Sequence, residues 1–313
     1  MSNTNWTTEK IEDQKGRVAI VTGSSSGIGY EAARVLANKG AAVIIAVRNL
    51  DKGTKAADKI RSQNANAKVE VMQLDLADLE SVGSFADAFK RSHARLDLLI
   101  NNAGVMTPPY SKTKDGFELQ FGTNHLGHFA LTLRLLNLLN TTEGARIVNV
   151  SSSAHRVGNI DFDDLTWEKR GYSRWRAYGD SKIANIYFTK ELSRLLRENG
   201  SRVVVTAAHP GWTATELQRN MDYFGIASIL NSLFAQSITM GALPTLRAAF
   251  DPNVKGGEFF GPGGFMRMWG YPVLEQPNEL AKDTTLAERL WKVSEDLTGA
   301  KYDLNISAAT AKA

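Results

Sequence analysis

The chain of 313 residues contains no cysteine, which excludes disulfide bonds, thiolate nucleophiles and thiolate metal sites. It also contains no run of the roughly 18 apolar residues that a membrane-spanning helix needs. The first residues, MSNTNWTTEKIEDQKG, are polar and lack the apolar core of a signal peptide. Together these absences predict a cytoplasmic protein without a transmembrane segment.

Neither sign of charge is strongly in excess, and no Pro-, Gly- or Ser-rich linker or fixed-period repeat divides the chain. The formal net charge is +4 and is dispersed, so nucleic acid is not an expected partner. With 43% hydrophobic residues, the chain can bury one large core. We therefore predict a single domain over residues 16–300, preceded by an N-terminal extension (1–15) and followed by a C-terminal tail (301–313).

Short apolar runs alternate with longer amphipathic segments of helical length. Seven runs are predicted strands: RVAIVTG, AAVIIAV, KVEVMQL, LDLLINN, ARIVNVSS, RVVVTAAHP and GGEFFG. Because these runs are apolar almost throughout, both faces of the sheet should be buried. The order predicts an α/β, Rossmann-type doubly wound fold, in which helices cover both faces of a seven-stranded parallel sheet. Ligands are expected at the carboxyl ends of its strands.

Two segments interrupt the alternation, at residues 153–177 and 212–240. Long irregular insertions at the ligand end of a sheet are usually binding loops, so both are predicted to lie on the substrate side. The second segment contains the apolar stretch YFGIASILNSLFA. That stretch could instead lie on a membrane surface, but it lacks the basic flank that such helices usually carry.

The turn TGSSSGIG, Thr22 to Gly29, follows the first strand and opens a helix near Ile28. Gly23 allows a tight reversal, Gly27 allows the backbone to approach a pyrophosphate, and Gly29 allows the helix to pack on the strand. The free N–H groups of the helix then face the anion. No Gly-Lys-Ser/Thr follows, which disfavours nucleotide hydrolysis. A glycine-rich turn alone is weak evidence for a dinucleotide.

The end of the second strand, AVRN, bears on which dinucleotide is bound. Val47 stands where an acidic residue would accept from a ribose 2′-hydroxyl, and Arg48 follows it. An arginine beside the ribose suits a 2′-phosphate, so we predict NADP(H) over NAD(H). The alternative is a solvated surface arginine without a ligand.

Downstream, the segment YGDSK places Tyr178 and Lys182 four residues apart, on one face of a predicted helix. A neighbouring ammonium favours a phenolate and so lowers the tyrosine pKa. The serines 151–153 end a strand at the ligand edge, where a hydroxyl can hold a substrate carbonyl; an ordinary helix cap is the alternative. Asn124 interrupts an apolar helical pattern. It either holds a water there or is a satisfied core residue.

These motifs resemble the short-chain dehydrogenase/reductase family over roughly residues 16–300. The turn TGSSSGIG is similar to the family's cofactor loop, NNAG (Asn101 to Gly104) to its fourth-strand motif, and YGDSK to its Y-x-x-x-K motif. The segment HPGWTAT, His209 to Thr215, is similar to the family's Pro-Gly segment beside the nicotinamide. Four motifs in this order are very specific.

The resemblance implies an active site of Ser152, Tyr178 and Lys182, with Asn124 completing a proton relay. It also implies that Asp75 bonds the adenine amino group. The cofactor-binding residues that it implies, besides Tyr178 and Lys182, are Gly23, Ser25, Ser26, Gly27, Ile28, Gly29, Arg48, Asn49, Asp75, Leu76, Asn102, Ala103, Gly104, Pro210, Gly211, Thr213 and Thr215. Ser152 is chosen among the three serines because it matches the second serine of the family's V-x-x-S-S pattern.

Within the family, the long interval from Ser152 to Tyr178 is similar to the retinol dehydrogenase and protochlorophyllide reductase branch. VNVSSSAH and SKIANIYFTKEL match segments of that branch. The branch mostly uses NADP(H), in agreement with Arg48. The chain lacks the N-terminal anchor of the membrane-bound retinol enzymes and the active-site cysteine of the pigment reductases. The resemblance therefore implies reduction of a carbonyl, or oxidation of an alcohol, without naming the substrate.

Several alternatives stay open at this point. A dinucleotide sensor or scaffold without catalysis would keep the fold, and a reductase of carbon–carbon double bonds would keep the site. Relatives often pair through the helix of Tyr178 and the segment FGTNHLGHFALTLRLL, so a homodimer is one alternative and a monomer the other. Three tryptophans could stack on an apolar or cyclic substrate or pack within their loops: Trp167, Trp175 and Trp212.

The histidines do not form a metal set. His125 and His128 lie on a helical pattern without an acidic partner nearby, and His155 stands apart from them. His209 precedes a strand-end proline, which favours a structural role. No metal is expected.

Overall fold

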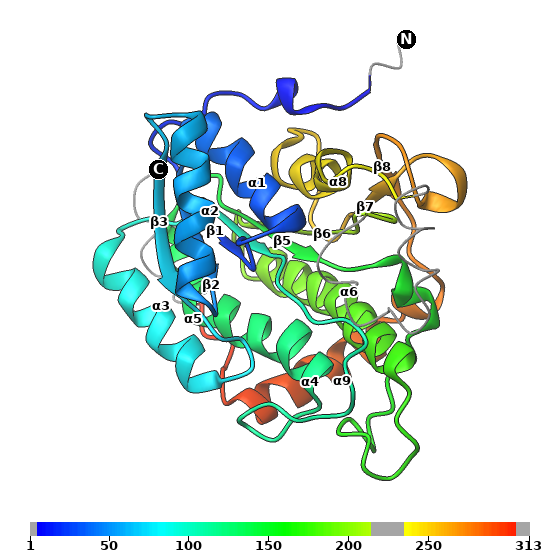
Figure 1. Cartoon of the computed structure of the whole chain (residues 1–313). Coiled ribbons are helices and arrows are strands. Elements are labelled where there is room, and N and C mark those ends of the chain that lie inside the picture. Colours follow the sequence, from blue (N-terminus) through cyan, green and yellow to red (C-terminus); the bar gives the residue numbers. More distant parts are fainter. Residues whose placement is uncertain (1–4, 214–234, 305–313) are drawn as a thin grey trace.

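The computed structural model describes residues 5–213 and 235–304. At its centre lies an eight-stranded sheet in the order β3-β2-β1-β4-β5-β6-β7-β8 (Figure 1). The strands are β1 Val18–Thr22, β2 Ala42–Val47, β3 Lys68–Gln73, β4 Leu98–Asn101, β5 Arg146–Val150, β6 Val204–Ala208, β7 Phe259–Pro262 and β8 Pro272–Glu275. Neighbours are parallel except for β7 and β8. The doubly wound fold is therefore confirmed.

The prediction of seven parallel strands was wrong by one. Strand β8, with the sequence PVLE, pairs antiparallel with β7 at the edge of the sheet. Leu274, in its middle, is 48% exposed. A four-residue edge strand that begins with proline and ends with glutamate lacks the continuous apolar run by which the central strands were recognised.

Helices cover both faces of the sheet. They are α1 Gly27–Asn38, α2 Leu50–Gln63, α3 Leu79–Ser92, α4 Leu119–Phe121, α5 Gly127–Thr141, α6 Arg174–Glu198, α8 Ile238–Phe250 and α9 Thr284–Thr298. Helices α1, α2 and α8 share one buried cluster with the sheet, and α3, α5 and α6 share another. Successive residues of β1, such as Ile20 and Val21, point into opposite clusters, which is why the central strands are apolar throughout.

Short helical turns connect these elements: η1 Thr8–Lys10, η3 Ser153–Val157, η5 Phe265–Arg267, η6 Leu280–Lys282 and the π-helical segment η2 Gly122–Leu126. The strand order reverses between β1 and β4. Ligands of open α/β sheets bind at such a crevice. None of the helices in the described ranges is both long and apolar enough to cross a bilayer.

The N-terminal extension packs against the domain, because Trp6 and Ile11 are buried in the cluster shared with α1. At the other end, Tyr302 packs on Trp291, with ring centroids 5.9 Å apart. The remainder of the tail, residues 305–313, lies outside the described residues.

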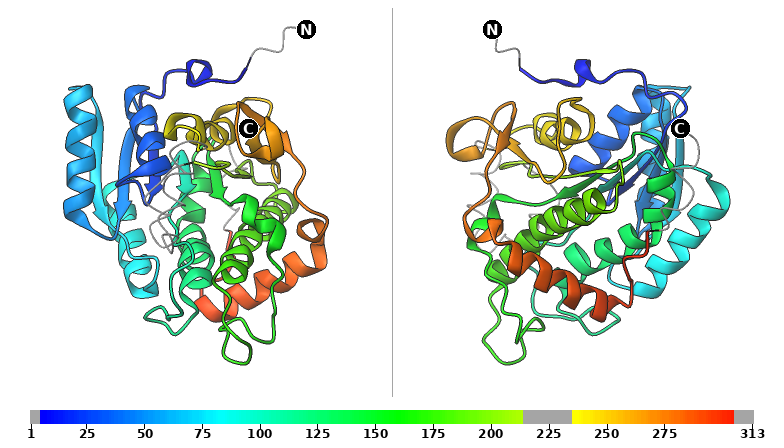
Figure 2. Two further views of the ribbon diagram at one scale, coloured as in Figure 1. Left: turned by 45° about the vertical axis from the view of Figure 1, so that its right-hand side comes forward. Right: turned by 180° about the vertical axis from the view of Figure 1, so that it is seen from behind.

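Helix α9 lies along α6 and covers the outer face of α5 and α6 (Figure 2). The ring centroid of Trp291 lies 5.0 Å from that of Phe129 on α5 and 6.0 Å from that of Phe188 on α6. Leu290 is 1% exposed. The C-terminal helix of the same chain thus covers the face of α5 and α6. A homodimer, one of the two arrangements left open by the sequence, would pair through that face.

We therefore expect the protein to be a monomer in solution. Pairing through α5 and α6 would require α9 to leave, which would expose Trp291 and Leu290 at a cost of about 2 kcal/mol for each side chain. Sedimentation equilibrium should give the chain mass of 34.3 kDa at all concentrations tested. A mass of twice that value would contradict this expectation and place the dimer contact elsewhere.

The first insertion, residues 153–177, contributes its two ends to the second cavity described below, where Ser153, Ala154, Val157 and Trp175 line the wall. Its middle packs against α4 and the segment that precedes α4. There the Tyr172 hydroxyl donates to Glu118 at 2.8 Å, and the Gln120 side chain donates to the carbonyl of Arg174 at 3.0 Å. The composition of this loop alone does not reveal that its partners are the buried polar side chains of Glu118 and Gln120.

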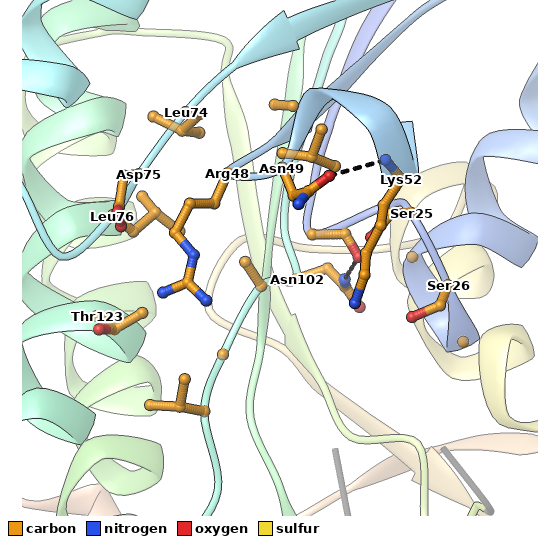
Figure 3. Close-up of a pocket in the computed structure, with 18 of the residues that line it drawn as sticks. Ser25, Ser26, Arg48, Asn49, Lys52, Leu74, Asp75, Leu76, Asn102 and Thr123 are labelled. Carbon is orange, nitrogen blue, oxygen red and sulfur yellow. Dashed lines mark hydrogen bonds between the residues drawn. The ribbon is translucent and has the colours of Figure 1, made fainter. Parts of the chain in front are cut away.

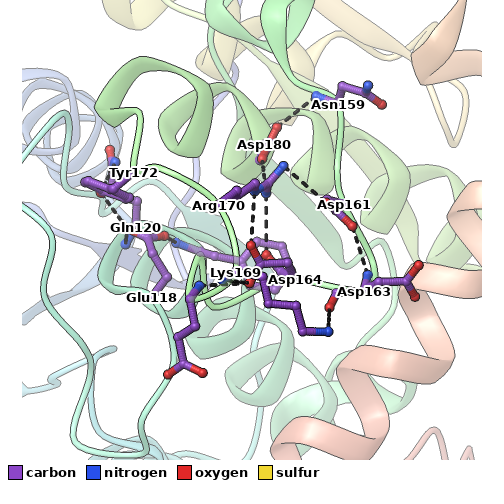
Figure 4. Close-up of polar contacts among 12 residues, drawn as sticks. Glu118, Gln120, Asn159, Asp161, Asp163, Asp164, Lys169, Arg170, Tyr172 and Asp180 are labelled. Atoms are coloured by element: carbon purple, nitrogen blue, oxygen red, sulfur yellow. Dashed lines mark hydrogen bonds and ion pairs between the residues drawn. The ribbon is translucent and has the colours of Figure 1, made fainter.

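One arginine holds the middle of this loop together. Arg170 lies 3.5–3.6 Å from carboxylate oxygens of Asp161, Asp164 and Asp180, and its guanidinium lies 3.7 Å from the ring centroid of Trp167 (Figure 4). Asp180 lies on α6 and also accepts from the Asn159 backbone at 2.8 Å. This cluster fastens the loop to the helix that carries Tyr178.

Asp180 should make the stability of the protein depend on pH. Burial raises its pKa to about 7 despite the backbone donor and Arg170. Because the folded pKa exceeds the unfolded value of about 3.9, this contribution to stability is complete below pH 4 and is lost as the pH rises through 7. Asp180→Asn cannot ionise and keeps the acceptor for Asn159.

The stability of wild type relative to Asp180→Asn should therefore fall by about 3 kcal/mol between pH 5 and pH 8, measured by urea unfolding. Asp163→Asn is the matched control, since Asp163 lies in the same loop and its side chain is 88% exposed. If the Asp180 variant tracks wild type at every pH, the carboxyl does not titrate in this range.

Candidate active site

A cavity of about 410 Å³ lies in the crevice between β1 and β4. Thirteen of the predicted cofactor residues line it: Gly23, Ser25, Ser26, Gly27, Ile28, Gly29, Arg48, Asn49, Asp75, Leu76, Asn102, Ala103 and Gly104. These residues come from the ends of four strands, because parallel strands bring their carboxyl ends to one edge of the sheet. Lys52 and Thr123 also line the cavity and were not predicted.

The glycines of the turn leave no room for side chains against the fourth strand. A Cβ on Gly29 would lie 2.4 Å from the Asn102 side-chain nitrogen, and one on Gly23 would lie 2.8 Å from Ala103. Gly23 and Gly27 also have positive φ angles of 64° and 60°, which glycine adopts without strain. The turn therefore packs directly onto the NNAG segment.

Thr22 joins the two segments. Its hydroxyl accepts hydrogen bonds from the backbone N–H groups of Asn102 and Ala103, each at 2.9 Å. The Asn102 side chain in turn donates to the Thr22 carbonyl at 2.8 Å. These bonds fix the floor of the cavity before any ligand enters.

The cavity presents donors that the protein itself does not use. Ser26 caps α1 without a side-chain hydrogen bond, so the helix N-terminus is available to a phosphate. Figure 3 shows Arg48 and Lys52 reaching into the cavity from the end of β2 and the start of α2. Within the described ranges, no hydrogen bond or ion pair engages the Arg48 guanidinium. Beside it, Val47 is buried. These groups fit a dinucleotide that carries an additional phosphate.

A second cavity, of about 370 Å³, contains Ser152, Tyr178 and Lys182. It shares Ile28, Asn102 and Gly104 with the first cavity. Its far wall includes Pro210, Gly211 and Thr213. Thr215 lies outside the described residues, as do residues 214–234 of the second insertion. The structure therefore brings the three predicted catalytic side chains together beside the cofactor cavity.

Tyr178 and Lys182 are both buried on α6. Burial raises the pKa of Tyr178 to about 12, although a hydrogen bond with Ser152 acts to lower it. Burial lowers the pKa of Lys182 to about 8. The Lys182 ammonium lies 5.6 Å from the Tyr178 ring centroid and donates to the Val150 carbonyl at 3.2 Å. In the protein alone, desolvation therefore outweighs the lowering of the tyrosine pKa that the sequence led us to expect.

The contacts of the three serines favour Ser152 as the functional one. Ser151 is buried, and its hydroxyl donates to the Lys182 carbonyl at 2.8 Å. Ser153 begins η3 and is exposed. Ser152 is partly exposed in the cavity, bonds Tyr178 and accepts from the Ala154 backbone at 3.2 Å.

Asn124 lies in the π-helical segment η2, so the local irregularity expected of the helix is present. Its side-chain oxygen accepts from the Val105 backbone at 2.8 Å, and its nitrogen donates to Val105 and to Ser181. Its backbone carbonyl accepts from His128 at 2.9 Å. The amide is thus a satisfied core group that positions Val105, and its part in a proton relay stays a prediction.

Two of the predicted non-metal histidines are internal. His125 bonds the Ser294 hydroxyl and His128 bonds the Thr22 hydroxyl, each at 2.8 Å. Burial lowers the pKa of His125 to about 3 and that of His128 to about 4. Both imidazoles are therefore neutral parts of the core.

Two of the three singled-out tryptophans, Trp175 and Trp212, line the second cavity. Trp167 does not, because it is buried beneath Arg170. Trp167 therefore packs within its loop, whereas Trp175 and Trp212 are placed where an apolar substrate could stack on them.

Comparison with known proteins adds independent evidence. Residues 17–223 match the short chain dehydrogenase family. Retinol dehydrogenase 12 of Homo sapiens is 44% identical over 290 residues, which are 92% of this chain and 88% of that protein. Short-chain dehydrogenase TIC 32 B, chloroplastic, of Brassica napus is 40% identical over 294 residues, 90% of this chain and 88% of that protein.

Two solved structures resemble the fold. A protein of uncharacterised function from Mycobacterium paratuberculosis superimposes with a TM-score of 0.81 at 42% identity, covering 96% of this chain and 100% of that one. A short chain dehydrogenase from Shigella flexneri in complex with NADP gives a TM-score of 0.61 at 25% identity, covering 79% of this chain and 97% of that one.

Proposed function

The chain belongs to the short-chain dehydrogenase/reductase family of NAD(P)-dependent oxidoreductases, and from that premise we propose that it transfers a hydride between NADP(H) and an alcohol/carbonyl pair. The observation that carries the proposal is the junction of two cavities. One is lined by the glycine turn and Arg48, the other by Ser152, Tyr178 and Lys182. A sensor of dinucleotides would have no need of the second set.

Each residue has a distinct part in the proposed reaction. When bound, the dinucleotide supplies or accepts the hydride. Ser152 donates a hydrogen bond to the carbonyl oxygen and orients it. Tyr178 transfers the proton to or from that oxygen. Lys182 holds the nicotinamide ribose, and its charge lowers the pKa of Tyr178 once the site is closed to water.

The preference for NADP(H) rests on Arg48, which no described side chain engages, and on the apolar Val47 beside it. An aspartate or glutamate in place of Val47 would repel a 2′-phosphate, whereas a guanidinium can bond it bidentately. Ser25, Ser26 and the N-terminus of α1 would hold the pyrophosphate. Asp75 would accept from the adenine.

The second cavity favours an apolar or cyclic substrate. Apart from the catalytic groups, its walls are largely apolar and include Met106, Val157, Trp175, Trp212 and Met268. Several relatives are named retinol dehydrogenases, so retinaldehyde belongs in the test panel beside aromatic and aliphatic aldehydes and ketones. We also propose a cytoplasmic location. One relative of similar identity is named chloroplastic, so the location is a separate point to test.

The proposal is tested by titrating the protein with NADPH and NADH and then following oxidation of NADPH at the reduced-nicotinamide absorbance with the carbonyl panel. Tight NADPH binding and turnover of apolar carbonyls are expected. Tight binding without turnover of any carbonyl, followed by turnover of conjugated alkenes, would replace carbonyl reduction by double-bond reduction. Binding without any turnover would favour a sensor.

A further inference from the structure

A carboxylate is buried beneath the second cavity without belonging to the catalytic set. Glu275, the last residue of β8, has a side chain only 3% exposed. One of its oxygens lies 2.8 Å from the imidazole Nε2 of His209, and the other lies 2.9 Å from the guanidinium of Arg156. Burial raises the pKa of Glu275, but the bonds to His209 and Arg156 outweigh it and hold that pKa below its ordinary value. A buried charge of this kind is costly unless it is fully paired.

The hydrogen bonds of His209 fix its tautomer. The backbone N–H of Gly211 donates to Nδ1 at 3.3 Å, so Nδ1 is the acceptor and Nε2 carries the proton. Nε2–H therefore donates to Glu275, as a neutral imidazole oriented by a carboxylate would. The imidazole thus links Glu275 to the backbone of the turn that follows it.

A second imidazole, His155, supports the serine turn that also lines this cavity. His155 donates from Nδ1 to the carbonyl of Ser152 at 2.7 Å, and its Nε2 accepts from the backbone of Asn278 at 3.5 Å. The ring of Phe259 contacts both histidines, with its centroid 5.3 Å from each of their ring centroids. The C-terminal strands therefore hold both the serine turn and the turn after His209.

The residues around His209 and Gly211 are tightly packed. A Cβ on Gly261 would lie 2.1 Å from Nε2 of His209 and 2.3 Å from the Glu275 carboxylate. Gly211 has a φ angle of 66°, and a Cβ there would lie 2.4 Å from the Met268 carbonyl. The turn formed by residues 210–213 is thus fixed by its surroundings and not by its own residues alone.

We propose that His209 and Glu275 are positioning residues that set the turn at residues 210–213 against the reactive end of the bound dinucleotide. This inference rests on the proposed function. The adenosine part would occupy the first cavity, and the reacting part must reach Tyr178 in the second, whose wall includes Pro210, Gly211 and Thr213. The pair therefore governs one half of the dinucleotide site and leaves the other half untouched.

The test compares two ligands that share the first cavity. NADPH reaches both cavities, whereas 2′-phospho-ADP-ribose lacks the nicotinamide. Glu275→Gln keeps an acceptor for His209 but loses the charge that faces Arg156. We expect it to weaken NADPH binding about tenfold and to lower the turnover number about 10- to 100-fold, while the affinity for the fragment changes less than about twofold. Isothermal titration calorimetry gives both affinities.

Two further variants keep the test decisive. His209→Asn retains an acceptor for Gly211 but loses the bond to Glu275, and it should show the same selective loss; it also serves if Glu275→Gln does not fold. Glu279→Gln is the surface control, because the Glu279 side chain is 89% exposed and its carboxylate pairs with the nearby Lys282. It should leave both affinities unchanged.

An equal loss of affinity for both ligands, or no loss for either, would overturn the positioning role. If the wild-type protein binds neither NADPH nor the fragment, the proposed function itself fails. If instead the wild-type protein binds both ligands and the variant keeps the same ratio of the two affinities, only the positioning role fails.

Discussion

Tyr178→Phe is expected to lower kcat/KM for carbonyl reduction by about a thousandfold or more, while the dissociation constant for NADPH changes little. The substitution removes only the hydroxyl that transfers the proton. The ring remains buried, and the hydrogen bond with Ser152 is lost. Stopped-flow measurement of NADPH oxidation and titration of NADPH fluorescence separate the two quantities.

Tyr187→Phe provides a matched control on the same helix. Tyr187 is 1% exposed, and its hydroxyl donates to the Leu280 carbonyl at 2.8 Å, away from both cavities. Its loss should cost about 1 kcal/mol of stability and leave turnover intact. Retained turnover in Tyr178→Phe would remove this tyrosine from the proton-transfer step.

Arg48→Gln is expected to raise the dissociation constant for NADPH by about 30- to 100-fold and to leave that for NADH nearly unchanged. Charge-assisted hydrogen bonds of the kind a 2′-phosphate would make with Arg48 contribute roughly 2–3 kcal/mol. Arg48 is exposed and lines the cavity beside the apolar Val47, so the folded structure should tolerate the change. Fluorescence titration with both reduced dinucleotides measures the effect.

Lys52→Gln distinguishes a specific contact from general attraction of an anion. Lys52 lines the same cavity from the first turn of α2. If Arg48 alone bonds the 2′-phosphate, the lysine variant should weaken NADPH by no more than a few-fold. If both variants weaken NADPH binding equally, the site attracts the phosphate by its positive charge and makes no defined contact with it. If neither variant weakens NADPH binding, the assignment to NADP(H) is wrong.

The parts of the site that could be predicted from the sequence are local or lie at strand ends. The glycine turn, Asn102 and Tyr178 each occur in a short motif, and a parallel sheet brings the ends of its strands together. The apolar runs therefore predicted which strand ends meet at one edge of the sheet, and the family resemblance implied which residues of those ends line the cavity.

The parts that could not be predicted depend on contacts between distant segments. Glu275 is hydrogen-bonded to His209, which lies 66 residues away in the sequence. No sequence pattern around either residue predicts this contact. Strand β8 is short and partly exposed, and the loop around Arg170 is fastened to the rest of the protein by Asp180 on α6. The direction of the Tyr178 pKa shift was missed for a related reason, because the degree of burial follows from packing and not from spacing along a helix.

The cover that α9 provides for α5 and α6 has a consequence for mass action. In an obligate dimer, the burial of such a face depends on the concentration of the protein. Here the covering helix is tethered to the same chain, so its effective concentration at that face is fixed by the connection and does not fall on dilution. We therefore expect the helix that carries Tyr178 and Lys182 to be supported equally at nanomolar and micromolar protein.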